Sequence, residues 1–143
     1  MKTTLNKIKA AQACEERYKV LLAGLGKTAA DDEPLPIRTI LEINGIKDAI
    51  WALRAVEGYD REIRLFTCDC AEMVLPLFEK RYPNDQRPRM AIEVSRMYAN
   101  GNATDGELAA AGAAAGDAAW DAAWADIEKL LLKYLDGFEE GGK

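Results

Sequence analysis

Residues 70–101 read CAEMVLPLFEKRYPNDQRPRMAIEVSRMYANG, and this stretch decides the fold class. It contains two amphipathic segments joined by a Pro-Asn-Asp turn, with charged residues between the apolar positions. Apolar residues that recur every three or four positions are typical of helices that bury one face. The stretch therefore predicts a pair of helices, the second of them capped by Asp85. The predicted apolar stripe of the first helix consists of Ile63, Phe66, Cys70, Val74, Leu77 and Phe78. Pro76 lies inside the first helix, where it removes a backbone donor and should kink the helix or break its last turn.

The same periodicity extends along the chain in both directions. Toward the N-terminus it predicts one helix over residues 5–25, capped by Thr3 or Thr4, followed by short helices over 36–44 and 46–58. Asn44-Gly45 is a stop or turn signal between the two short helices, and the second of them is marked by Ile46, Ile50 and Leu53. Toward the C-terminus, Thr104 and Glu107 form a capping box that opens an alanine-rich helix. No segment shows a convincing strand pattern. We predict an all-α, single-domain bundle of about six helices, with N-terminal helices in 1–58, a helical pair in 59–101 and a C-terminal helix in 104–138.

The composition is that of an ordinary globular domain. The 143 residues are 49% hydrophobic and 30% charged. No apolar run approaches the ~20 residues of a membrane span, and the N-terminal segment lacks the apolar core of a signal peptide. Three cysteines, an odd number, fit a reducing compartment better than a disulfide framework. The sequence therefore predicts a cytoplasmic protein with no membrane partner.

Histidine is absent from the sequence. This removes the commonest general base and the commonest zinc ligand, and it lowers the expectation of catalysis. The formal charge of −5 argues against nucleic-acid binding, which needs cations to replace phosphate counterions. We predict no enzyme activity, no catalytic residue, no cofactor, no metal and no nucleic-acid partner. The chain begins basic and ends acidic, which could attract the two ends to each other within the fold or between subunits of a homodimer.

One segment, GLGKT at 24–28, resembles the end of a phosphate-binding loop. The full motif needs a glycine where this chain has Leu21, a preceding strand and a following helix. Here a helix is predicted before it and a loop after it, so a glycine that ends a helix is the favoured interpretation. Lys27 and Thr28 nevertheless define an alternative function as a helical enzyme or nucleotide-binding protein.

Cys68 and Cys70 are the other candidate ligands. Residues two apart do not share a face of a helix, and no histidine can complete a tetrahedral site. Small buried hydrophobes are the favoured interpretation of both thiols.

The charged residues of the helical pair allow three interpretations. They can be solvated ion pairs, a polar network that fixes the packing of the two helices, or catalytic carboxylates with basic partners. We favour the structural interpretations, because ion pairs on helix surfaces are common and no polarising partner can be identified.

Trp120 and Trp124 belong to a short repeat, DAAWDAAW, over residues 117–124. A period of four keeps both indoles on nearly one face, and Ile127, Leu131, Tyr134 and Phe138 extend the same stripe. Tryptophans at this spacing are more often core than stacking platform or partner anchor, because they bury large apolar areas. Two glycines four apart, at 112 and 116, offer a small surface for close helix packing or a dimer seam.

Residues 60–101 resemble a family of all-helical immunity proteins encoded beside bacterial polymorphic toxins. The likeness is carried by the DRxxRL segment at 60–65, by CAExVLPxFE at 70–79 and by the residues from Pro83 to Gly101. The flanks resemble small proteins of tailed phages and prophages in the LGKT segment, in NGxxDAxWxLR at 44–54 and in the DAAW repeats. Relatives on the immunity side often carry histidines in the alanine-rich half, so no role of those residues transfers to this chain.

The resemblance implies a non-catalytic phage or prophage protein that binds and inhibits a protein target. The target would be a bacterial toxin, for an immunity protein, or a host defence component such as a CRISPR effector, for an anti-CRISPR inhibitor. A structural, homo-oligomeric phage protein is a further alternative. An acidic helix would suit a basic target. The candidate partner-binding residues are Asp117, Asp121, Glu128, Asp69, Glu72, Arg87 and Arg89.

Overall fold

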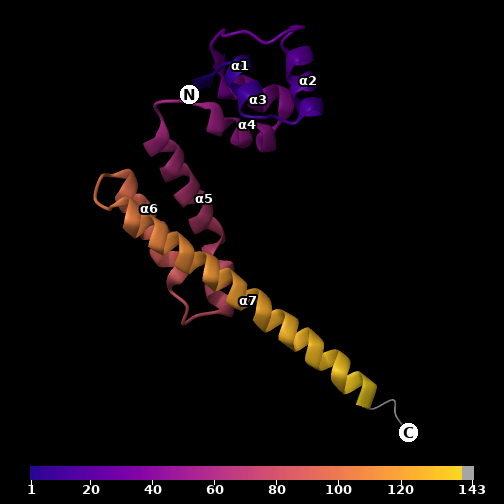
Figure 1. The fold of residues 1–143 in the computed structure, drawn as a ribbon, viewed down its shortest axis with the longest axis vertical. Coiled ribbons are helices and arrows are strands. Elements are labelled where there is room, and N and C mark those ends of the chain that lie inside the picture. Colours follow the sequence, from indigo (N-terminus) through magenta and orange to yellow (C-terminus); the bar gives the residue numbers. More distant parts are fainter. Residues whose placement is uncertain (140–143) are drawn as a thin grey trace. The chain divides into compact units, whose positions relative to one another are not determined.

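The computed structural model describes the backbone of residues 1–139 and the side chains of residues 1–125, 127 and 128. The elements in chain order are β1 (Lys2–Thr3), α1 (Leu5–Ala10), α2 (Glu15–Gly24), β2 (Leu35–Pro36), α3 (Ile37–Asn44), α4 (Ile46–Ala52), the 3-10 turn η1 (Leu53–Ala55), α5 (Asp60–Arg81), α6 (Arg87–Ala99) and α7 (Asp105–Glu139). Figure 1 labels the helices α1 to α7. The all-α prediction is confirmed. The described residues form seven α-helices, where about six were expected, and one antiparallel pair of two-residue strands.

The chain forms two compact units, residues 1–63 and residues 64 onward. The predicted single domain, with its segments 1–58, 59–101 and 104–138, stays a prediction. Among the described residues, no helix combines the length and the apolar character needed to cross a bilayer.

In the first unit, the prediction of one helix over residues 5–25 is wrong. The chain instead breaks between α1 and α2, where Gln12 adopts a φ of 62°. Thr4 caps α1 as expected, its hydroxyl accepting from the backbone N–H of Lys7 at 3.2 Å. The break lets Leu5 and Ile8 of α1 reach the same core as Leu21 of α2, and this tertiary packing overrides the helical pattern of the sequence.

The core of the first unit is small and aliphatic. Its buried side chains are Leu5, Ile8, Leu21, Leu35, Ile40, Ala49, Ala52 and Ala55. The sequence predicted a helix marked by Ile46 and Ile50, but these side chains are 59% and 45% exposed, and α4 buries its alanines instead. A helix packed so closely leaves no room for the larger residues on its inner face.

Two contacts tighten this core. Thr3 is the buried polar residue of the unit, and its hydroxyl donates to the carbonyl of Ala55. Gly24 lies against α3, where a Cβ would come within 2.4 Å of Ile43 Cγ2. The predicted stop at Asn44-Gly45 is confirmed, since α3 ends at Asn44 and Gly45 has a φ of 83°.

In the second unit, α5 runs without a break through Pro76 to Arg81. The alternative of a broken last turn is therefore wrong, and a kink stays a prediction. The predicted inner stripe of α5 is also wrong. Val74 and Leu77 are 59% and 75% exposed, whereas Cys68 and Leu75 are buried. Because α5 carries apolar residues on several faces, its periodicity alone does not identify the face that packs.

Helix α6 lies along the first half of α7, and the second half of α7 continues past it (Figure 1). At ~1.5 Å per residue, the 35 residues of α7 span ~52 Å. The predicted capping box opens this helix: the N–H of Glu107 donates to the Thr104 hydroxyl at 3.2 Å, and the N–H of Thr104 donates to the Glu107 carboxylate at 2.7 Å. The small surface at Gly112 and Gly116 is open, since a Cβ there would meet nothing within 4 Å.

Candidate partner-binding surface

Two arginines of α6 join it to α5. The Arg96 guanidinium contacts Asp69 at 2.8 Å and also pairs with Glu72. Arg89 makes two parallel hydrogen bonds to Glu79, at 2.7 and 2.8 Å. The predicted residues Asp69, Glu72 and Arg89 therefore fasten the helical pair together, as the structural interpretation expected.

Arg87 connects the turn before α6 to α7. Its guanidinium pairs with Asp85 through two hydrogen bonds, at 2.9 and 2.7 Å, and contacts Asp121 at 2.8 Å. The hydrogen bonds from Arg87 hold the pKa of Asp85 below its ordinary value, and the two carboxylates raise the pKa of the guanidinium. Asp85 also accepts from the backbone N–H of Arg87 at 3.1 Å, close to its predicted capping role. Asp121 is thus a structural contact as well as an acidic surface group.

Two tyrosines add to these links. The hydroxyl of Tyr82, the residue that follows α5, donates to the Ala122 carbonyl of α7 at 3.1 Å. Tyr98 lies under the Arg64 guanidinium, 4.8 Å from ring centroid to Cζ, and donates to Asp105 at 2.6 Å. The hydrogen bond to Asp105 raises the pKa of Tyr98.

Sequence reasoning missed the roles of Tyr82, Tyr98, Glu79 and Arg96. Their partners lie on other helices or in the next turn, so spacing within one helix carries no signal of these pairs.

The prediction that Trp120 and Trp124 form core is wrong. Their side chains are 67% and 61% exposed, and Ile127 on the same face is 49% exposed. Helix α7 buries Ala118 instead, which lies about 160° around the helix from Trp120. The small residue faces the neighbouring helices, and the large aromatic residues face away from them.

Acidic side chains border this aromatic face on one edge. At about 100° per residue, the three apolar side chains share an arc of about 60°, and the three acids occupy the adjacent arc of about 40°. Asp117 and Glu128 are exposed and form no ion pair within the described part of the chain, whereas Asp121 contacts Arg87. We call this set the tryptophan–acid surface: Trp120, Trp124, Ile127, Asp117, Asp121 and Glu128. The predicted continuation of the stripe, Leu131, Tyr134 and Phe138, lies outside the described side chains.

The alternative nucleotide site has no phosphate-binding geometry. Lys27 pairs with Asp31 at 2.6 Å and with Glu33 at 2.5 Å, and these contacts raise its pKa. A helix precedes the segment and Gly26 adopts a φ of 66°, as expected for a helix end followed by a loop. Thr28 is exposed. The carboxylates of Asp31 and Glu33 therefore already pair with the Lys27 ammonium, which a phosphate group would have to bind.

The described side chains contain no group of three or more potential ligands that could hold a metal ion. Cys68 is buried and its thiol lies 3.9 Å from the Ile92 carbonyl. Cys70 is exposed, which corrects the prediction that both thiols are buried.

Comparisons with curated proteins and with solved structures returned no match. A family model described as Imm-5 like putative immunity protein matches residues 56–133, more than half of the chain. The matched span contains α5, α6 and most of α7, with their ion pairs and the whole tryptophan–acid surface. The family supports a general role in binding and inhibiting another protein rather than in catalysis. The resemblance to immunity proteins is confirmed, and the chain belongs to the Imm-5 like putative immunity protein family.

Proposed function

We propose that this protein binds and inhibits a protein target through the tryptophan–acid surface. The observation that carries the proposal is the exposure of Trp120 and Trp124 on a face that α6 does not cover. Tryptophan is among the residues that dominate binding energy at protein interfaces, and clustered exposed apolar side chains mark interaction sites. The surface lies inside the family-matched span.

The acids beside the indoles indicate the charge of the partner. Asp117 and Glu128 have no cationic partner within the described residues, so a basic surface could pair with them. Such complementarity mainly raises the association rate and selects against acidic partners. Two copies of this chain would bring like charges together, which favours a basic target over self-association.

The ion pairs behind the surface give it a fixed shape. Arg87 and Tyr82 tie α7 to the α5–α6 turn at Asp121 and Ala122, between the two tryptophans. A surface held in place before binding loses less conformational entropy on association. We therefore assign Asp69, Glu72, Arg87 and Arg89 to positioning the helices, and Asp117 and Glu128 to contact with the target.

Two kinds of protein target fit this proposed role. Membership of the immunity family supports a bacterial toxin as the target. The phage-like flanks support a phage or prophage origin, for which the target would be a host defence component such as a CRISPR effector. Either target would be met in the cytoplasm. Gene neighbourhood separates the two, because a neighbouring toxin gene indicates immunity and an early phage operon indicates anti-defence.

The test compares the wild-type chain with three variants immobilised at equal density. Trp120→Ala/Trp124→Ala removes the anchors, and Asp117→Lys/Glu128→Lys reverses the free acids. The matched control, Glu42→Lys/Glu93→Lys, reverses two exposed acids that form no ion pair in the described chain and lie on other helices. Partners from a toxin-bearing or phage-infected host are identified by mass spectrometry. The partner is then purified, and its own activity is titrated with each variant.

We expect stoichiometric inhibition by the wild type and the control, and a loss of at least tenfold in affinity for the tryptophan variant. Charge reversal should slow association, more strongly at low salt than at high salt. Equal inhibition by all four proteins would mean that the interface does not involve the tryptophan–acid surface of α7. Turnover of the partner, rather than stoichiometric inhibition, would overturn the non-catalytic role.

A further inference from the structure

Helix α5 has a second apolar face, on the side away from its buried residues Cys68 and Leu75. At about 100° per residue its members share an arc of about 100°, and no charged residue between positions 63 and 77 falls in that arc. We call this set the outer α5 face: Phe66, Cys70, Met73, Val74 and Leu77. All five residues are exposed, and none belongs to the tryptophan–acid surface, so a role of this face is independent of the proposed function.

The spacing of this face is that of a contact between two helices. Together with Ile63, its apolar positions alternate in steps of three and four residues, at positions 63, 66, 70, 73 and 77. Two helices that share such a repeat, of 3.5 residues on average, interdigitate their side chains along a common seam. The spacing therefore indicates that the face is covered by another helix with the same repeat, and α5 is itself such a helix.

The charges at the two ends of α5 make the helix complementary to itself. Its first turn carries Asp60 and Glu62, and its last turn carries Lys80 and Arg81. Glu62 and Lys80 are five helical turns apart and lie on the same edge of the outer α5 face. In an antiparallel pair, Glu62 of each copy therefore meets Lys80 of the other, and the opposed helix ends also attract each other. A parallel pair would instead bring like charges and like helix ends together.

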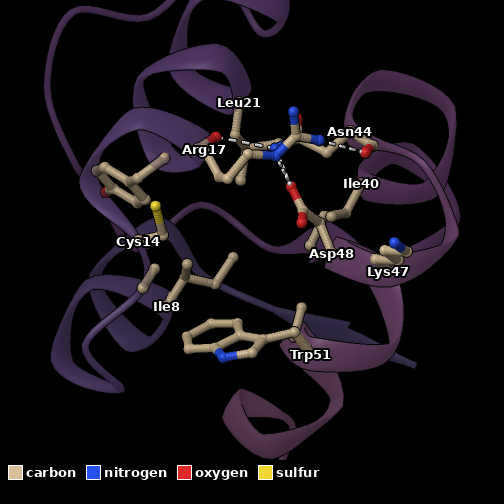
Figure 2. A pocket seen from close by; sticks show the side chains of 12 residues that line it. Ile8, Cys14, Arg17, Leu21, Ile40, Asn44, Lys47, Asp48 and Trp51 are labelled. Carbon is tan, nitrogen blue, oxygen red and sulfur yellow. Dashed lines mark hydrogen bonds and ion pairs between the residues drawn. The ribbon is translucent and has the colours of Figure 1, made fainter.

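These end charges are available to a second copy. Lys80 is exposed and forms no ion pair among the described residues, and Glu62 is exposed and contacts its neighbour Arg61 at 3.7 Å. In the first unit, by contrast, Arg17 already contacts Asp48 at 2.7 Å beside a cavity (Figure 2). The outer α5 face thus keeps opposite charges at its two ends that an antiparallel copy can pair.

The exposed area of the face corresponds to a weak dimer. The exposed fractions are 82% for Met73, 75% for Leu77, 59% for Val74 and 39% for Phe66, the equivalent of about two and a half whole residues. At roughly 200 Å² for a large residue, this is about 500 Å² on each copy and ~1,000 Å² in a pair. Standard interfaces bury ~1,200–2,000 Å², so the seam lies at the lower limit of specific contacts. We therefore expect a dissociation constant in the micromolar range.

We propose that the outer α5 face binds the same face of a second copy of this chain, with the two helices antiparallel. In this arrangement a two-fold axis passes between the helices, midway between the third and fourth turns. Phe66 of one copy packs against Leu77 of the other, and Cys70 packs against Met73. The contact uses none of the residues of the tryptophan–acid surface.

The first test is the mass of the full chain in solution. It is measured by sedimentation equilibrium under reducing conditions from ~1 to ~300 μM, a range that spans micromolar dissociation constants. The wild type should rise with concentration from 15.8 kDa toward twice that mass. Met73→Lys places a charge in the middle of the seam and should weaken dimerisation at least tenfold. The matched control Met97→Lys changes a methionine of α6 that is 47% exposed, and it should dimerise as the wild type does. Both variants should keep the helical circular dichroism spectrum of the wild type, because both side chains are exposed.

The second test is an exchange of charges. Glu62→Lys leaves two lysines at each end of the pair, and it should weaken dimerisation by about twofold to fivefold, the range of an exposed ion pair. Glu62→Lys/Lys80→Glu restores opposite charges at both ends, and its dissociation constant should return to that of the wild type. A double variant that dimerises no better than Glu62→Lys overturns the antiparallel arrangement.

Three results of the first test would overturn the proposal as a whole. The wild type could stay at 15.8 kDa at every concentration. Met73→Lys and Met97→Lys could behave alike, which would show that the contact is not confined to the outer α5 face. Trp120→Ala/Trp124→Ala, which should dimerise as the wild type does, could instead be monomeric, and the tryptophan–acid surface would then be the contact between copies.

Discussion

Replacing Trp120 or Trp124 with alanine should show, by the change in unfolding free energy, whether these indoles belong to a partner-binding surface or to a core. If these indoles belong to a partner-binding surface, their removal should change the stability of the isolated chain little. If they formed a core, as the sequence suggested, each replacement should cost ~3–5 kcal/mol of unfolding free energy. The two outcomes differ enough to be measured.

The magnitude follows from the exposure of the two side chains. With 67% and 61% of their surface in water, about a third of each residue is covered. For a tryptophan of ~250 Å², this is ~80–100 Å², or at most ~2.5 kcal/mol at ~25 cal/mol per Å². Part of that cover is the residue's own helix and persists in a compact unfolded chain. Alanine also has the higher helix propensity, by ~0.5 kcal/mol. We expect a net loss below ~1.5 kcal/mol for each variant.

The assay is urea unfolding of the full chain followed by circular dichroism, with acrylamide quenching of tryptophan fluorescence as a second readout. Both indoles should be readily quenched in the wild type. Leu75→Ala is the positive control, because Leu75 is 5% exposed in α5 and its truncation should cost ~2–5 kcal/mol. All proteins are compared at several concentrations, since self-association would make the midpoint depend on concentration.

A loss of 3 kcal/mol or more for either tryptophan variant would refute the assignment. It would mean that α7 is covered in solution, by this chain or by a second copy. A concentration-dependent midpoint in the wild type that disappears in the variants would identify a second copy as the cover.

Three further predictions concern local contacts. Thr3→Val keeps the side-chain shape but removes the hydrogen bond to Ala55, and should lower the unfolding free energy by ~1–3 kcal/mol in urea titrations. Gly24→Ala should also destabilise, by ~1 kcal/mol net, because the clash with Ile43 outweighs the gain in helix propensity; a more stable variant would show that the contact is not that close. The pKa of Asp85 is lower in the folded than in the unfolded chain, so its stabilising contribution is present above about pH 4 and lost as the pH falls through the folded value. In thermal melts from pH 7 to 2, the melting temperature of Asp85→Asn should therefore fall less at low pH than that of the wild type. An equal fall in both proteins would contradict the pairing of Asp85 with Arg87.

Much of the secondary structure follows from local signals. The capping box at Thr104, the stop at Asn44-Gly45 and the cap at Thr4 are satisfied by atoms a few residues away, so the sequence alone locates them. The break at Gln12 has no such signal. It is decided by the packing of α1 and α2 on a shared core, which a pattern read along one helix does not contain.

The candidate surface was predictable only in its acidic part. Asp117, Asp121 and Glu128 are visible as a charged edge in the sequence, and their place beside the tryptophans follows from helical spacing. That Trp120 faces outward is not visible there, because an aromatic stripe suits a core and an interface equally well.

By itself, the sequence determined an all-α chain, the capping of its helices and its likeness to immunity proteins, because these depend on periodicity, local hydrogen bonds and residue identity. The tertiary structure decided which faces are buried and which charges are paired. Helix α7 packs through Ala118 and leaves its indoles in water, and Arg96 holds Asp69 and Glu72 across two helices. Both outcomes depend on which helices become neighbours, and that is set by the fit of whole surfaces rather than by the spacing of residues within one helix.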